Sequence, residues 1–174
     1  YNPETIAQGS ILHNQRNPDI VIIGQPDLDF SKEIIEIYKN ICANQPEIHV
    51  MDRLSAEISK VTLNCYLTTK IAFANAVGDL ALEVGADPEK ILAAVGGDPR
   101  IGRKYFQHGY GYGGPCFPRD NKAFTNFAAD HGMSAVINIA TDQANRDHLD
   151  NQVKRFVSIH RKDEPVVLES VTYK

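Results

Sequence analysis

One cysteine stands where a nucleophile would be placed. Cys116 ends a glycine-rich stretch and directly precedes a predicted helix, with Pro118 in the first turn and Asp120 four residues after the cysteine. Unpaired amide groups and the dipole at a helix start stabilise an anion, and so favour the thiolate form of a cysteine. We therefore expect Cys116 to be reactive. Asp120 could serve only as the first-turn acid that complements the helix dipole.

The other two cysteines are expected to be inert. Cys42 and Cys65 lie on apolar faces of predicted helices, and small buried cysteines are the common case. Three cysteines without a C-x-x-C pair, and without histidines at metal-ligand spacing, predict neither a disulfide framework nor a metal site. This cysteine usage favours a reducing compartment, the cytoplasm.

Lys60 and Asn64 form a polar pair in an otherwise apolar stretch. They are one helical turn apart, and Thr68 extends the same row. One interpretation is a lysine that pairs with Glu57 or with a carboxylate of a partner subunit. The other is a positive charge and an amide donor that together stabilise an oxyanion formed on a substrate.

Two further features carry weaker signals. Glu4, in Asn2-Pro3-Glu4, would by itself be a solvated loop acid. The glycine loop 109–114 suggests a phosphate cradle, but it lacks G-K-[ST] and does not connect a strand to a helix in a βαβ unit. The remaining candidates are scattered histidines, expected to be surface or hydrogen-bonded core residues: His108, His131 and His160.

The first elements predict part of an α/β domain. Residues 20–24 are a β-branched run closed by glycine, Ser31 can cap a helix with apolar residues up to Ile41, and residues 48–51 form a second strand. Because two strands do not make a stable sheet alone, residues 1–52 are expected to be the end of a larger domain.

A long helix follows, predicted from Ser55 as N-cap to Gly85 at the C′ position. Its length of about 46 Å exceeds the roughly 30 Å diameter of a small domain. Apolar residues cover most of its circumference, so it must be buried on several sides. In a chain this short, that predicts a homodimer formed through helix 55–85.

The rest of the chain is also predicted to be mainly α-helical. Asp87-Pro88-Glu89 starts a helix that Gly96-Gly97 ends, and residues 98–117 form one long glycine-rich loop. A helix from Pro118 to His131 ends at Gly132, and Ser134 is expected to cap a helix that runs to about His160. Residues 165–168 are predicted to be a strand that opens a further unit.

The charge balance excludes two classes of partner. The 174 residues include 18 Lys and Arg against 22 Asp and Glu, a net charge of −4, with no basic run. Neither nucleic acid nor a membrane surface is therefore an expected partner. No segment reaches the roughly 18 apolar residues of a membrane span. The start at Tyr1, without Met or a signal-peptide pattern, suggests that the chain begins inside a longer protein.

Four motifs in the same order resemble the UDP-glucose/GDP-mannose dehydrogenases: Asn2-Pro3-Glu4, Lys60-x-x-x-Asn64, Arg100-Ile101-Gly102 and residues 111–120. The resemblance implies a nucleotide-sugar 6-dehydrogenase that oxidises an alcohol twice with NAD, through an aldehyde, a cysteine thiohemiacetal and a thioester, to a uronate. It makes Cys116 the nucleophile and Lys60 and Asn64 the oxyanion donors. Asp120 would orient the hydrolytic water, and Glu4 would act as base.

The resemblance also implies the substrate contacts and the domains. Arg100 would reach the sugar in the neighbouring subunit, and the loop from Tyr105 through Tyr112 to Gly113 would bind the nucleotide-sugar. NAD would be bound mostly by a preceding domain. The fold would be a 6-phosphogluconate-dehydrogenase C-terminal-like helical domain, at 53–162, between an α/β remnant at 1–52 and the start of a nucleotide-binding domain at 163–174. Two residues depart from the family pattern: Gln8 and Pro115.

Several alternatives remain open at this level. The substrate would be a UDP-sugar, UDP-glucose or a UDP-N-acetylhexosamine, with GDP-mannose as the alternative. A catalytically inactive dimerisation module and a cysteine hydrolase that pairs Cys116 with a histidine are the rival functions. The chain alone is expected to be inactive, because most of the NAD site would lie outside it.

Overall fold

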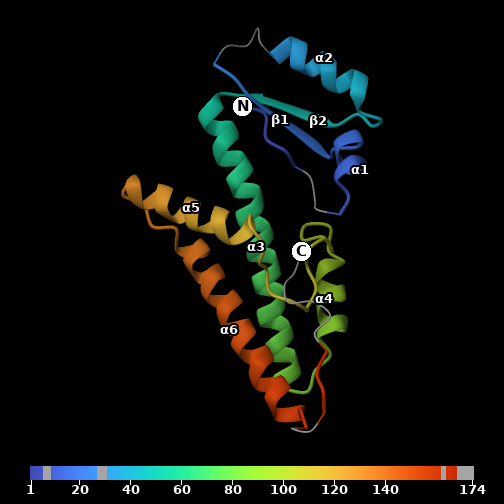
Figure 1. The fold of residues 1–174 in the computed structure, drawn as a ribbon, viewed down its shortest axis with the longest axis vertical. Coiled ribbons are helices and arrows are strands. Elements are labelled where there is room, and N and C mark those ends of the chain that lie inside the picture. Colours follow the sequence, from blue (N-terminus) through green and yellow to red (C-terminus); the bar gives the residue numbers. More distant parts are fainter. Residues whose placement is uncertain (6–8, 27–30, 162–163, 168–174) are drawn as a thin grey trace. The chain divides into compact units, whose positions relative to one another are not determined.

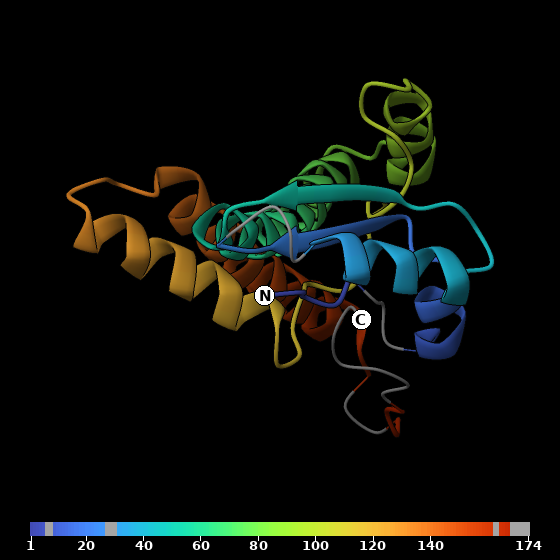
Figure 2. The same ribbon diagram turned by 90° about the horizontal axis from the view of Figure 1, so that it is seen from above.

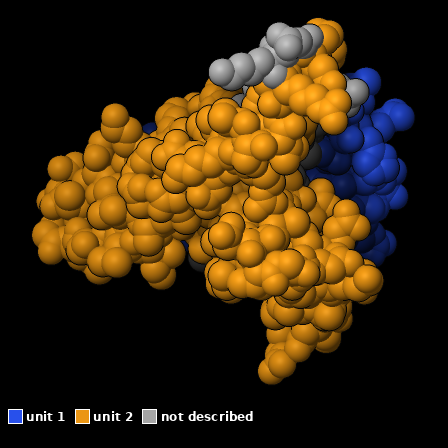
Figure 3. All heavy atoms as spheres, turned by 90° about the horizontal axis from the view of Figure 1, so that it is seen from below, with its two compact units in different colours: residues 1–63 blue, residues 64–174 orange. Residues whose placement is uncertain are grey.

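The computed structural model describes residues 1–5, 9–26, 31–161 and 164–167. It divides into two compact units, residues 1–63 and 64–174 (Figure 3). The architecture is mainly helical with a small parallel sheet, as the sequence predicts. Among the helices of the described residues, none is both long and apolar enough to cross a membrane.

The first unit contains the predicted strand, helix and strand (Figure 1). β1 (Ile20–Gly24) and β2 (Glu47–Met51) pair in parallel, with Ile22 opposite His49, and α2 (Ser31–Ile41) connects them. The β-branched run of β1 is buried, which is why it forms the inner part of this unit. The two predicted strands and the helix between them are confirmed. α2 already includes Ser31, and the residue before it lies outside the described residues, so the Ser31 cap stays a prediction.

The chain start lies along β1. The amino group of Tyr1 donates to the carbonyl of Gly24 at 2.8 Å, and the Asn2 amide donates to the carbonyl of Ile22 at 2.7 Å. A short helix not predicted from the sequence, α1 (Ile11–Arg16), follows and has no buried residue. Because no side chain of α1 is buried, its sequence carries no apolar periodicity from which the helix could be predicted. Gln8, one of the two departures from the family pattern, lies outside the described residues.

The long helix is α3 (Arg53–Glu83), and its start differs from the prediction. The backbone N–H and the hydroxyl of Ser55 both donate to the carboxylate of Asp52, at 2.9 and 2.6 Å. Asp52 is therefore the capping residue, and the prediction of Ser55 as N-cap is wrong, because the carboxylate accepts both bonds. Gly85 has a φ of +75° and ends the helix as predicted.

α4 (Pro88–Gly96) begins as predicted, with the Asp87 side chain accepting bonds from the backbone of Glu89 and Lys90. Its buried Leu92 packs with Ala74 of α3 and with Phe106 of the following loop. This small core fixes the start of the long loop against α3.

α5 (Phe117–Asp130) and α6 (Val136–Ile159) complete the second unit and pack on each other (Figure 2). Gly132, with a φ of +71°, follows α5 as predicted. The Ser134 cap is wrong: Ala135 precedes α6 and no side chain caps it. Residues 165–167 are not a strand in the structure, and Leu168, the last residue of that predicted strand, lies outside the described residues.

Candidate active site

Cys116 is the N-cap residue of α5, and its thiol is exposed. Its side chain makes no capping hydrogen bond, while its carbonyl accepts the backbone N–H of Asp120 at 2.8 Å. The thiol therefore stands at the positive end of a 14-residue helix without being used to cap it. This is the placement predicted from the sequence.

Asp120 is buried and held by two side chains. The Asn64 amide, from α3, donates to Oδ2 at 2.6 Å, and Arg119 Nε donates to Oδ1 at 2.9 Å. Asp120 in turn raises the pKa of the Arg119 guanidinium above its ordinary value. A carboxylate that only complemented a helix dipole would be solvated. Asp120 is instead oriented by partners from two helices, and the structure joins it to Asn64.

Cys65 lies beneath this pair. Its thiol donates to the carbonyl of Asp120 at 3.6 Å, and it is buried. Burial and the negative charge of Asp120 raise the pKa of the Cys65 thiol to about 11. Cys65 is therefore a protonated thiol at neutral pH. It is also buried, whereas Cys116 is exposed.

Lys60 and Glu4 belong to the first unit. Glu57, the intrachain partner considered for Lys60, pairs instead with Arg53 at 3.3 Å. Among the described residues, no ion pair involves Lys60, which is half-buried on α3 one turn before Asn64. Glu4 is exposed. The catalytic roles of both residues stay predictions.

The glycine loop is fixed through its backbone. The Asn145 side chain accepts the N–H of Tyr112 at 2.9 Å and donates to its carbonyl at 3.0 Å. Asn75 makes the same kind of double contact, accepting from Gly109 at 2.9 Å and donating to the carbonyl of Tyr110 at 3.1 Å. A Cβ at Gly111 would lie 2.7 Å from Asn145 Oδ1. Glycine is needed there so that the loop can approach this amide.

The side chain of Tyr112 points into the protein. It is 5% exposed, and its phenol donates to Asp142 and accepts from Asn121. Burial and the Asp142 carboxylate raise the pKa of Tyr112 above its ordinary value. The Asn138 amide completes the network by donating to Asn121 at 2.9 Å. The substrate role of Tyr112 stays a prediction.

Sequence reasoning missed the amides that hold the loop. These are Asn75, Asn121, Asn138 and Asn145. Each falls inside a helix, where asparagine has poor intrinsic propensity, and this mismatch was the available signal. Their tertiary partners lie far along the chain, so spacing alone does not reveal them.

The other predicted substrate residues lie in the long loop between α4 and α5. Arg100 is exposed and its guanidinium binds Asp98 at 2.6 Å. Tyr105 has a positive φ of 61° and packs against the cluster of Ile71, Ala72 and Tyr112. Gly113 is partly exposed between the clamped Tyr112 and Gly114. Their contacts with substrate stay predictions.

The model of the UDP-glucose/GDP-mannose dehydrogenase family, central domain, matches residues 54–147. A UDP-glucose 6-dehydrogenase of Pseudomonas aeruginosa is 35% identical over 144 residues, which are 83% of this chain and 32% of that protein. The UDP-glucose 6-dehydrogenase YwqF of Bacillus subtilis is 35% identical over 129 residues, 74% of this chain and 29% of that protein. The chain thus spans about a third of the length of these relatives.

Solved structures show the same similarity. A UDP-glucose dehydrogenase from Pyrobaculum islandicum superposes with a TM-score of 0.78 at 39% identity, over 83% of this chain and 33% of that chain. A UDP-D-ManNAc dehydrogenase from Pyrococcus horikoshii superposes with a TM-score of 0.77 at 20% identity, over 90% of this chain and 36% of that chain. The second comparison shows a shared fold.

Proposed function

The chain belongs to the UDP-glucose/GDP-mannose dehydrogenase family, and we propose that the full-length protein is an NAD-dependent nucleotide-sugar 6-dehydrogenase. It would oxidise a UDP-sugar, UDP-glucose or a UDP-N-acetylhexosamine, to the uronate. One observation carries this proposal: the exposed thiol of Cys116 lies at the N-terminus of α5, one turn before a buried carboxylate that Asn64 and Arg119 orient. A nucleophile and a positioned carboxylate are what thioester chemistry requires.

The first unit supports a dinucleotide site that is completed elsewhere. Its parallel strands, joined by a helix, are the repeating unit of dinucleotide-binding sheets, which bind ligands at the carboxyl ends of their strands. Gln25 follows β1 at this edge, and its amide is buried without a partner among the described residues. A buried amide of this kind fits a polar ligand. When bound, NAD would supply the hydride acceptor.

Cys116 would carry the covalent step. After the alcohol is oxidised to the aldehyde, the thiolate adds to the aldehyde carbon and forms a carbon–sulfur bond, giving a thiohemiacetal. Loss of a second hydride gives the thioester, and water then cleaves the carbon–sulfur bond to release the uronate and the thiol. An exposed thiol stays reduced in a compartment such as the cytoplasm, where we place the protein.

Asn64, Lys60 and Asp120 would serve the charged stages of this sequence. The Asn64 amide has two N–H groups and uses one on Asp120, so the second is available to an oxyanion. Lys60 precedes Asn64 by one turn of α3 and would add a positive charge. Asp120 would orient the water that attacks the thioester, with Glu4 as the base.

We also propose that the protein is a homodimer through α3. Tyr66, Phe73 and Leu80 are spaced by seven residues on this helix and are 60%, 57% and 65% exposed. Residues seven apart lie on one helix face, so they form an apolar stripe that a second copy can cover. Light scattering on the chain at micromolar concentration should give the dimer mass, and a monomer mass would contradict the proposal.

The decisive experiment is Cys116→Ser in the full-length protein, with Cys42→Ser as the matched control. We expect the variant to bind UDP-sugar normally but to lose uronate formation by more than about 10³-fold, because a serine hydroxyl stays protonated and cannot replace the thiolate. Uronate is measured by chromatography and NADH by absorbance. Equal losses in binding and turnover would assign Cys116 a structural role, and unchanged turnover would overturn the proposed mechanism.

A further inference from the structure

Three side chains outside the Cys116 site converge from separate parts of the second unit. Asp79 comes from α3, His108 from the long loop and His148 from α6. His148 Nδ1 lies 2.8 Å from Asp79 Oδ2, and His108 Nε2 lies 3.1 Å from Asp79 Oδ1. The two imidazoles and the carboxylate each offer a ligand atom, all within 4.8 Å of one another. The His148 side chain is fully buried, and those of Asp79 and His108 are largely buried.

The surroundings fix the orientation of these groups. His148 Nε2 faces the carbonyl oxygen of Gly109 at 2.7 Å, and since a carbonyl only accepts, Nε2 carries a proton. The Asn151 amide donates to Asp79 Oδ2 at 3.2 Å. Metal-ligating histidines characteristically donate their second nitrogen to a carbonyl or carboxylate, and ligating carboxylates are themselves hydrogen-bonded. Both features of an outer coordination shell are present here.

Gly78 leaves room for the His108 ring beside α3. A Cβ at Gly78 would lie 2.2 Å from His108 Cδ2, so only glycine at this position of α3 lets the ring approach the helix. The ring also meets His148 edge to face, with centroids 5.5 Å apart. Packing from α3 and α6 therefore keeps His108 Nε2 directed at Asp79.

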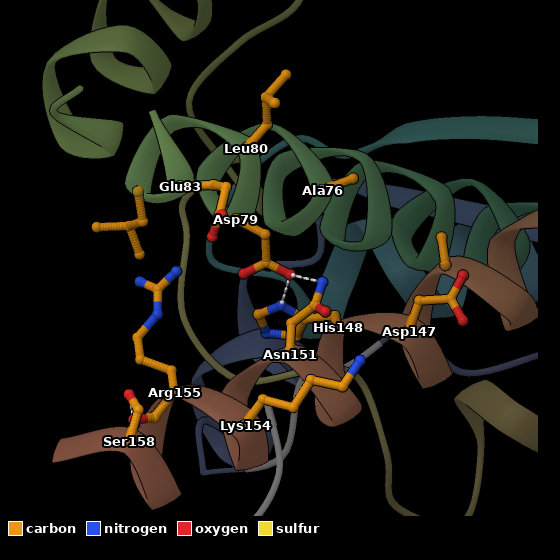
Figure 4. A pocket seen from close by; sticks show the side chains of 12 residues that line it. Ala76, Asp79, Leu80, Glu83, Asp147, His148, Asn151, Lys154, Arg155 and Ser158 are labelled. Carbon is orange, nitrogen blue, oxygen red and sulfur yellow. Dashed lines mark hydrogen bonds and ion pairs between the residues drawn. The ribbon is translucent and has the colours of Figure 1, made fainter. Parts of the chain in front are cut away.

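A route to the cluster is open. Asp79 and His148 line a groove of about 890 Å³ between α3 and α6. Figure 4 shows the Asp79 carboxylate, the His148 ring and the Asn151 amide facing one another in this groove. A cation could enter here, and a water molecule from the groove could occupy a fourth ligand position.

We propose that Asp79, His108 and His148 form a binding site for a divalent transition-metal ion, with Zn²⁺ as the best fit. Two imidazole nitrogens and one carboxylate oxygen suit Zn²⁺, whereas Mg²⁺ and Ca²⁺ prefer oxygen ligands. The ion would replace the protons between the two imidazoles and the carboxylate, so binding releases protons. Because His148 and Gln152 both hold the carbonyl of Gly109, the ion would tie the glycine loop to α3 and α6.

Sequence spacing gave no sign of this site. Its ligands are separated by 29 residues between Asp79 and His108 and by 69 between Asp79 and His148. The proposal does not depend on the dehydrogenase activity proposed above, because it rests on the contacts among Asp79, His108 and His148 alone.

Calorimetric titration of the full chain with Zn²⁺ tests the site, after treatment with a chelator and in a Cys116→Ser background that removes the exposed thiol. We expect one ion per chain and a melting temperature that rises with Zn²⁺, as for any ligand of the native state. His108→Gln should weaken Zn²⁺ binding by more than about 100-fold, and Asn151→Ala, which removes an outer-shell partner, by about 10-fold. The control His13→Gln, on the exposed α1, should leave binding unchanged.

Two results would overturn the site. One is the absence of saturable Zn²⁺ binding to the parent chain, which would leave the cluster as a hydrogen-bonded ion group only. The other is equal weakening by His108→Gln and His13→Gln. If circular dichroism shows that His108→Gln does not fold, Co²⁺ binding to the parent chain is measured instead. The parent chain should then show the visible bands of four-coordinate Co²⁺, altered in Asn151→Ala, and six-coordinate bands unaffected by that change would contradict the site.

Discussion

The first turn of α5 and the network beneath the glycine loop use neighbouring residues in opposite ways. Asp120 faces Asn64 and Arg119 next to the exposed Cys116, whereas Asn121, the next residue, faces inward to Tyr112 and Asn138. The first region presents the Cys116 thiol to solvent. The second consists of buried polar groups that satisfy one another.

The difference shows how one helix can hold an exposed cysteine at its N-terminus without immobilising the thiol. A buried polar network is costly to leave partly satisfied, so it sets one arrangement of α5, α6 and the loop. An exposed N-cap cysteine contributes little to that arrangement, since its side chain makes no capping bond. Substitutions in the first region should therefore change reactivity, and substitutions in the second should change stability.

Apart from Cys116→Ser, the largest effect is expected for Lys60→Ala in the full-length protein. If its charge stabilises an oxyanion, kcat should fall by about 10²–10³-fold while the dimer stays intact. Steady-state kinetics and light scattering measure the two quantities. Unchanged kcat with a weakened dimer would instead assign Lys60 to an interface ion pair.

Asn64→Asp tests whether Asn64 and Asp120 act together. It would place a second carboxylate where the Asn64 amide now donates to Asp120 at 2.6 Å. Like charges at this distance disfavour ionisation of both groups, so we expect turnover to depend on pH more strongly than in the parent protein. A pH–rate profile identical to that of the parent would contradict the joint role of Asn64 and Asp120.

Alkylation should separate the two cysteines of this region. With a pKa of about 11, Cys65 has about 100-fold less thiolate near neutral pH than a thiol of pKa 9.0. We expect iodoacetamide to modify Cys116 at least about 100-fold faster than Cys65 at pH 7. Cys65 modification should keep rising with pH up to about 11. Peptide mass spectrometry after timed quenching gives both rates, and comparable rates would contradict the contrast.

Tyr112→Phe should reduce stability rather than thiol reactivity. Removing the phenol leaves Asp142 and Asn121 each without one buried partner. The free energy of unfolding should fall by about 1–3 kcal/mol, as urea denaturation would measure. Cys116 should keep its alkylation rate in the folded variant. A lower Cys116 alkylation rate with an unchanged free energy of unfolding would contradict this prediction.

The smallest effect is expected for Arg119→Ala. Arg119 binds the buried Asp120, but its own side chain is 68% exposed, and exposed ion pairs contribute about 0–1 kcal/mol. Unfolding stability, measured by urea denaturation, should therefore stay close to that of the parent protein. A clear loss of stability would show that Asp120 depends on this guanidinium as well as on Asn64.

The sequence by itself determined the local elements and the position of Cys116 at a helix start. The β-branched run at 20–24 and the Asp87-Pro88 start carry their signals in adjacent residues, as does the Cys116 motif, and the structure has each element where expected. The sequence did not decide the capping residue where two candidates lie close together. Asp52 caps α3 in place of Ser55, because both can accept a backbone N–H and only the folded geometry decides between them.

Only the tertiary structure decided which polar residues act together. Asn64 meets Asp120 across 56 residues, and Asp79 meets His148 across 69. No local pattern encodes such pairs, because they depend on how α3, α5, α6 and the glycine loop pack. Neighbouring residues in the sequence are enough to predict a cysteine at a helix start. The partners that orient its surroundings follow from burial, which requires each polar group inside the fold to find a distant counterpart.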